Sequence, residues 1–103
     1  MKLRGKQKRF LRSRANRMRP LISVGKQGLN QTWLDELVAA LNRRELVKIK
    51  ILQNSQYEVK DVKHFLETKT PIQVVQTIGK TLLVFMVAKK EKYRHISEQV
   101  KKI

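Results

Sequence analysis

The chain has 103 residues and a mass of 12.2 kDa, a length that fits a single domain. It contains no cysteine, which excludes disulfides, thiolate nucleophiles and cysteine-ligated metal centres. Lysine and arginine total 24 against 8 acidic residues, so the formal net charge is +16, and self-repulsion of this size favours a polyanionic partner, either nucleic acid or an anionic membrane surface.

The basic residues are concentrated near the N-terminus. Residues 1–34 contain ten of the 24 lysines and arginines and no acid, and the first acidic residue is Asp35. No apolar run approaches the roughly 20 residues that a transmembrane helix needs. We therefore expect a monomeric cytoplasmic protein, not inserted in a membrane, whose N-terminal third contacts a polyanion.

The first half of the chain predicts a helix, a strand and a second helix. A helix is expected over residues 4–17, where apolar residues recur at helical spacing and the opposite face is strongly basic, and Pro20 ends it. The apolar segment 21–24 is typical of a short strand. A second amphipathic helix is predicted at 31–43, with Asn30 as its N-cap.

The second half predicts a strand, a helix and two further strands. Residues 45–52 alternate between apolar side chains and lysines, which indicates a half-buried strand. A helix is expected at 57–68, with Ser55 as its cap. The last two strands are predicted at 72–78 and 81–87.

This order of elements, αβαβαββ, predicts an α+β fold in two layers. A tight turn at Gly79 joins the last two strands and makes them antiparallel, whereas each strand–helix–strand unit should give parallel neighbours. We expect a four-stranded mixed sheet with the helices on one face. The domain should cover residues 1–88, followed by a basic tail, 89–103, that is helical or flexible.

A loop between the first strand and the second helix has a pattern suited to phosphate contact. Gly25 and Gly28 bracket Lys26 and Gln27. Glycines allow close backbone approach and a positive φ, and a helix N-terminus offers unpaired N–H groups. This is the logic of a Gly-x-x-Gly clamp on a nucleic-acid backbone. A glycine-bearing turn with a purely structural role is the alternative interpretation.

No other motif indicates catalysis or metal binding. Gly79-Lys80-Thr81 is similar to the end of a P-loop, but Val74 stands where that motif needs glycine. His64 and His95 have no second ligand at metal spacing. We therefore predict no enzyme activity, no metal and no cofactor.

Four stretches together resemble a known family, the YhbY-like CRM (chloroplast RNA splicing and ribosome maturation) domain, over roughly residues 3–87. The stretches are 3–12, 20–29, 45–50 and 75–82. The resemblance implies a fold like the C-terminal domain of the third bacterial initiation factor, with sheet order 1-2-4-3. It also implies an RNA contact at Gly25, Lys26, Gln27 and Gly28, association with precursors of the large ribosomal subunit in bacteria, and group II intron splicing for plant organelle relatives.

Taken together, these observations predict RNA binding without catalysis, with ribosomal RNA of the precursor large subunit as the expected target. The candidate residues beyond the loop are the arginines at the end of the first helix and three lysines of the sheet and hairpin: Arg12, Arg14, Arg17, Arg19, Lys48, Lys50 and Lys80. Arginine forks onto phosphates and stacks on unpaired bases. A DNA-binding or nucleoid protein, a membrane-surface protein and an enzyme acting on RNA remain the alternatives.

Overall fold

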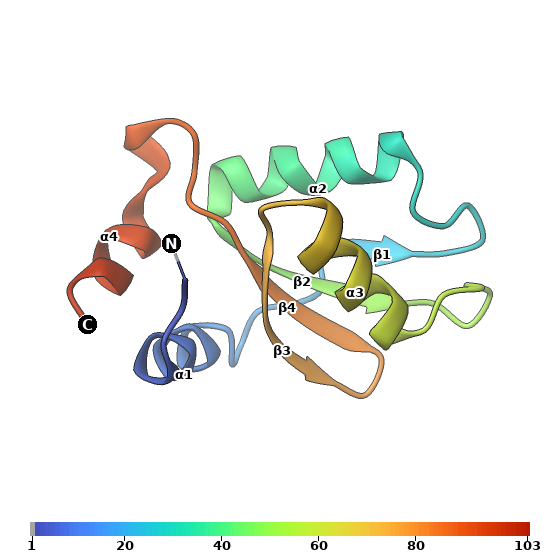
Figure 1. The fold of residues 1–103 in the computed structure, drawn as a ribbon, viewed down its shortest axis with the longest axis horizontal. Coiled ribbons are helices and arrows are strands. Elements are labelled where there is room, and N and C mark those ends of the chain that lie inside the picture. Colours follow the sequence, from blue (N-terminus) through green and yellow to red (C-terminus); the bar gives the residue numbers. More distant parts are fainter. Residues whose placement is uncertain (1) are drawn as a thin grey trace.

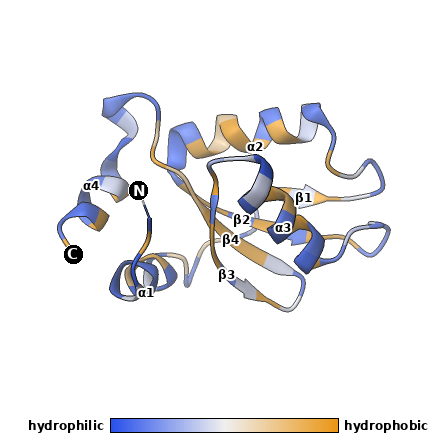
Figure 2. Cartoon of the chain, viewed as in Figure 1, coloured by the Kyte–Doolittle hydropathy of each residue, from blue (hydrophilic) through white to orange (hydrophobic). Residues whose placement is uncertain are grey.

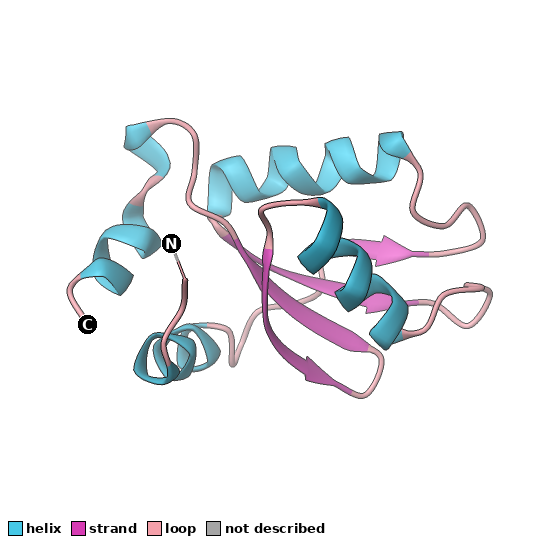
Figure 3. Ribbon diagram, in the orientation of Figure 1, coloured by secondary structure: helices cyan, strands magenta, loops and turns pink. Residues whose placement is uncertain are grey.

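A computed structural model describes residues 2–103 as four α-helices, one short 3-10 helix and four strands (Figures 1 and 3). In chain order the elements are α1 (Gly5–Arg14), β1 (Ile22–Val24), α2 (Gln31–Arg44), β2 (Leu46–Ile51), α3 (Val59–Lys69), β3 (Gln73–Ile78), β4 (Thr81–Phe85), η1 (Glu91–Tyr93) and α4 (His95–Lys101). The longest dimension of the molecule is 40 Å. The predicted order of helices and strands is therefore confirmed up to β4.

The four strands form one mixed sheet in the order β1-β2-β4-β3, which confirms the predicted order. β1 runs parallel to β2, and β4 is antiparallel to both β2 and β3. Ile49 in β2 lies opposite Ile22 on one side and Leu82 on the other. The hairpin between β3 and β4 turns at Gly79, whose φ of 55° is the positive value expected from the sequence.

The first face of the sheet is covered by α2 and α3. Alternate residues of β2 and β4, such as Val47, Ile49 and Val84, pack there against Leu37 and Leu66 of the two helices. Figure 2 shows apolar and hydrophilic residues alternating along α2, and its buried residues Leu37 and Leu41 belong to this core. This layer corresponds to the predicted sandwich.

The second face of the sheet is covered in part by α1 and α4, so the prediction that all helices lie on one face is corrected. Leu46, Leu83 and Phe85 point to this face and pack with Leu11 of α1 and Val100 of α4. The physical reason is that β4 is apolar on both of its faces and β2 adds Leu46 to the second one, and a central strand with two apolar faces needs a layer on each side. The chain supplies that second layer from its two ends.

Two helix boundaries also differ from the sequence-based predictions. The first helix ends at Arg14 and not at residue 17, because the chain turns through Ala15, where Met18 N–H donates to the carbonyl oxygen of Ala15 at 3.0 Å. The third helix is capped by Glu58 and not by Ser55. Glu58 and Asp61 form a reciprocal capping box there, whereas Ser55 Oγ accepts a hydrogen bond from Tyr57 N–H.

The segment after β4 is held against the domain by a buried carboxylate. Glu45, the residue after α2, has a φ of 63° and its side chain is fully buried. One carboxylate oxygen accepts from Ala88 N–H at 2.7 Å, and the other accepts from Ser97 N–H at 2.9 Å, in the first turn of α4. Residues 89–103 therefore follow a fixed path across the end of α2 to α1.

Candidate nucleic-acid interface

The Gly25–Gly28 loop forms an exposed turn between β1 and α2. Gly28 N–H donates to the carbonyl oxygen of Gly25 at 3.1 Å, which closes the turn. The side chains of Lys26 and Gln27 are exposed at its tip. Within residues 2–103, the backbone N–H groups of Lys26 and Gln27 donate to no protein acceptor. The loop therefore presents a mobile cation and two free backbone donors to an anion.

Both glycines face the neighbouring loop at 52–57, but only Gly28 leaves no room for a Cβ. A Cβ on Gly25 would lie 3.4 Å from Leu52 Cδ1, which is ordinary contact. A Cβ on Gly28 would lie only 2.7 Å from Tyr57 Cε2, and the φ of Gly28 is +73°. Gly28 is therefore required by both its backbone conformation and its packing.

The helix that follows the loop is anchored in a way that leaves the loop outside the core. Asn30 Oδ1 accepts from Trp33 N–H at 2.8 Å, which confirms the predicted N-cap of α2. Trp33 is only 8% exposed, and its Nε1–H donates to the carbonyl oxygen of Ser23 at 2.9 Å. Trp33 thus ties α2 to β1 beneath the loop and supports the loop from within.

The predicted arginines lie at the opposite end of β1 from the loop. Arg14, Arg17 and Arg19 are exposed and Arg12 is half-buried. Arg19 and Gly25 are six residues apart, so their Cα atoms are separated by at most about 20 Å. Figure 1 shows α1 and the loop toward opposite ends of the molecule. The arginines and the loop therefore do not form one compact site, and a ligand that touches both has to extend along β1.

Each end of this arginine segment faces a different part of the surface. Arg12 lines a groove of about 290 Å³ together with Lys48, on the half of the second sheet face that α1 leaves open. Arg19 lines a separate hollow with Arg44, the last residue of α2. The association of Arg19 with Arg44 has no counterpart in the sequence pattern.

The three predicted lysines occupy different environments. Lys48 Nζ donates to the carbonyl oxygen of Met18 at 2.9 Å, so this ammonium group holds the segment that links α1 to β1. Lys50 is exposed on β2. Lys80 is exposed in the hairpin and lines a cleft of about 570 Å³ with Lys60 and Lys63 of α3. Lys60 and Lys63 are not among the residues predicted from the sequence, although their spacing on a predicted helix places them on one face.

The candidate cations are not neutralised by nearby acids. In residues 2–103 the ion pairs are Lys60–Glu58 and Lys101–Glu98, both 3.7 Å long and exposed, and neither includes a predicted arginine or Lys26. Over the same residues there is no cluster of three or more potential metal ligands, and no helix is long and apolar enough to cross a membrane. Because neither ion pair involves Lys26 or the predicted arginines, these cations are available to an extended anion.

Comparisons with known proteins found a matching family model and several similar proteins. The family model of the CRS1/YhbY (CRM) domain matches residues 3–86. The chain is 42% identical to the probable RNA-binding protein YqeI of Bacillus subtilis, covering 87% of this chain and 94% of that protein. It is 31% identical to an RNA-binding protein of Haemophilus influenzae, covering 84% and 88%. The solution structure of a hypothetical protein from Staphylococcus aureus, 35% identical, is similar with a TM-score of 0.67 over 87% of this chain and 94% of that one.

Proposed function

The chain belongs to the CRS1/YhbY (CRM) domain family, and from this premise we propose that it is an RNA-binding protein that acts without catalysis. The observation that carries the proposal is the exposed turn at Lys26 and Gln27, whose amide N–H groups are free while the flanking glycines are packed against the domain. Such a turn is rigid and presents its donors outward. A phosphate group satisfies both the donors and the charge of Lys26.

The arginine segment extends the proposed contact from the loop along β1. Arg14, Arg17 and Arg19 are exposed, and guanidinium groups bind phosphates bidentately and stack on unpaired bases. Lys50 and Lys80 add charge from the sheet and the hairpin. The half-buried Arg12 contributes from the groove beside α1. We propose that RNA follows this path as an extended ligand and that the protein binds it as a monomer.

We propose that the target is ribosomal RNA in precursors of the large ribosomal subunit, in the cytoplasm. The support is the family resemblance, together with the exposed cations that extend from the loop along the arginine segment. Crosslinking in cells followed by sequencing of bound RNA is expected to enrich precursor large-subunit RNA. Reads spread evenly over messenger RNA would contradict this target. Recovery of genomic DNA, together with equal affinity for RNA and DNA of the same length, would favour the nucleoid alternative.

Replacing Lys26 by glutamate tests the loop directly. One phosphate contact on a single strand contributes about 0.7 to the slope of log affinity against log salt concentration. Losing that contact therefore weakens binding about fivefold at 0.1 M salt. Charge reversal adds repulsion, so we expect RNA affinity to fall about tenfold, measured by fluorescence anisotropy with a labelled RNA.

The matched control for this change is Lys69→Glu, which alters the net charge equally at the exposed end of α3. It is expected to bind RNA within about twofold of the native protein, because Lys69 is not part of the proposed contact. Salt also screens interactions between exposed charges more than about 10 Å apart. If the two variants bound with equal affinity, the loop would have no special part in RNA binding.

A further inference from the structure

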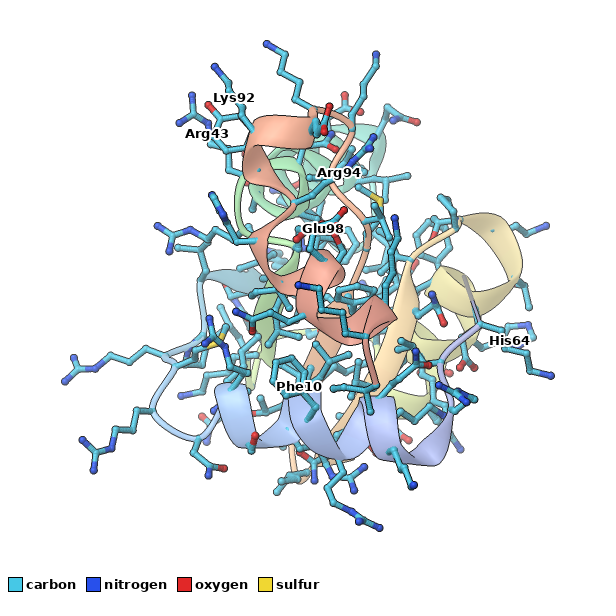
Figure 4. All side chains as sticks on the ribbon, turned by 90° about the vertical axis from the view of Figure 1, so that its left-hand side faces the viewer. Phe10, Arg43, His64, Lys92, Arg94 and Glu98 are labelled. Carbon is cyan, nitrogen blue, oxygen red and sulfur yellow. The ribbon has the colours of Figure 1, made fainter. Side chains whose placement is uncertain are left out.

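A second group of cations, outside the proposed RNA path, gathers where α2 ends. We call it the tail-end cluster, and it consists of Arg43, Arg44, Lys89, Lys90 and Lys92, all exposed. Arg43, Lys89, Lys90 and Tyr93 line one hollow there. Figure 4 views the molecule from this end and shows Arg43 and Lys92 close together at the top, with α1 at the bottom. Residues more than 40 positions apart in sequence thus build one basic surface.

The fold fixes the lysines of this cluster beside the arginines. Lys89 N–H donates to Asn42 Oδ1 at 2.9 Å, which joins the tail to the last turn of α2. The guanidinium of Arg94 donates to the carbonyl oxygens of Ala88 and Lys89 at 2.8 and 2.9 Å. These bonds and the Glu45 carboxylate hold the backbone of the tail, so the neighbouring ammonium groups are presented from a defined position.

Tyr93 also organises the cluster. Its ring is half-buried, and Arg43 Cζ and Lys92 Nζ lie 5.8 and 5.1 Å from its centroid, one from α2 and one from η1. Each distance is in the range of a cation–π contact. Two cations from different elements are therefore drawn to the same aromatic ring, although they repel each other.

The dipole of α2 explains only part of this arrangement. Arg43 and Arg44 interact favourably with the negative end of the helix, as basic residues in a last turn commonly do. The three lysines come from a separate segment that the helix does not require. Glu91 is the one exposed acid in η1, and no ion pair forms within the cluster as described for residues 2–103. The fold therefore concentrates like charges whose mutual repulsion a bound anion would offset.

We propose that the tail-end cluster is a second RNA backbone contact, separate from the Gly25–Gly28 loop. This inference rests on the proposed function. α2 has 14 residues, which places its two ends about 20 Å apart at 1.5 Å per residue. RNA bound at the loop reaches the cluster by following the arginine segment, since Arg19 and Arg44 line one hollow between them. The bound ligand is an RNA long enough to contact both ends of α2.

The test compares two double variants that change the net charge equally. Arg43→Gln with Lys90→Gln removes two charges of the cluster, and Lys69→Gln with Lys102→Gln removes two exposed charges elsewhere. Two lost phosphate contacts reduce the log–log salt slope by about 1.4, which corresponds to about 25-fold weaker binding at 0.1 M salt. The probe is a labelled single-stranded RNA of 20 nucleotides. We expect this loss of affinity for the cluster variant, whereas the affinity of the control variant should stay within about twofold of the native value.

The outcomes separate the two proposals. If the native protein did not bind the RNA, the proposed function would fail. If it bound and the two variants had equal affinity and salt slope, RNA binding would stand and the tail-end cluster would be excluded as a contact. Loss of binding to anionic phospholipid vesicles in the cluster variant, with RNA affinity unchanged, would also overturn the inference in favour of a membrane surface.

Discussion

Replacing Glu45 by alanine is expected to lower the free energy of unfolding by about 3–5 kcal/mol. The carboxylate is buried, and each of its oxygens accepts one backbone N–H, from Ala88 and from Ser97. Alanine leaves both donors without a partner, and an unsatisfied buried donor costs about 1–3 kcal/mol. Because a domain of this size is stable by only about 5–15 kcal/mol, the change should be readily measured by urea denaturation.

Two further variants distinguish the hydrogen bonds from the backbone conformation. Glutamine at position 45 keeps the shape of the side chain and one acceptor, so we expect about half the loss seen with alanine. Glycine relieves the cost of a φ of 63° but removes both acceptors, and it should be less harmful than alanine by about 1 kcal/mol. Equal stabilities of the alanine variant and the native protein would show that the carboxylate does not anchor the tail.

The fold was largely predictable because its main signals are local. Period-two alternation over Val47, Ile49 and Ile51 specifies β2, and the Asn30 cap specifies the start of α2. The positive φ at Gly79 follows from a two-residue turn between two apolar runs. Each of these depends on neighbours in sequence, where steric and hydrogen-bonding preferences act directly.

The second layer of the fold was missed because its cause is not local. The run from Leu82 to Phe85 is apolar at every position, which is typical of a strand buried on both faces. That signal was present, yet nothing nearby in sequence indicates that α1 and α4 supply the cover. Their contact joins residues far apart in sequence: the side-chain amide of Gln7 donates to the carbonyl oxygen of Val100, 93 positions away.

The residues of the candidate site could be predicted from the sequence, but their positions relative to one another could not. The exposure of Lys26 follows from its place in a loop tip, and the structure places it there. The sequence analysis treated the arginines and the loop as parts of one RNA contact, but β1 lies between them, so they stand at its two ends. The role of Lys48 was also hidden, because its partner is a backbone carbonyl, that of Met18, and no side-chain pattern marks such an acceptor.

Replacing Gly28 by alanine should reduce stability by about 2–3 kcal/mol and weaken RNA binding about tenfold in the protein that remains folded. A φ of +73° costs a residue with a Cβ about 1–2 kcal/mol. The added methyl would also lie 2.7 Å from Tyr57 Cε2, so the ring has to move. Tyr57 is 39% exposed and can shift outward, but it then no longer supports the turn that presents the Lys26 and Gln27 amides.

Two comparisons separate the contributions to this loss. Gly79→Ala introduces a Cβ at a φ of +55° with no atom within 4 Å, so only the backbone cost of about 1 kcal/mol applies and RNA affinity should stay near the native value. In a Tyr57→Ala background, the steric part of the stability loss caused by Gly28→Ala should disappear. The remaining loss in the free energy of unfolding should then be similar to that of Gly79→Ala. An additive double-mutant cycle would show that Tyr57 does not constrain the turn. Unchanged RNA affinity of the folded Gly28→Ala protein would show that the shape of the turn does not control binding.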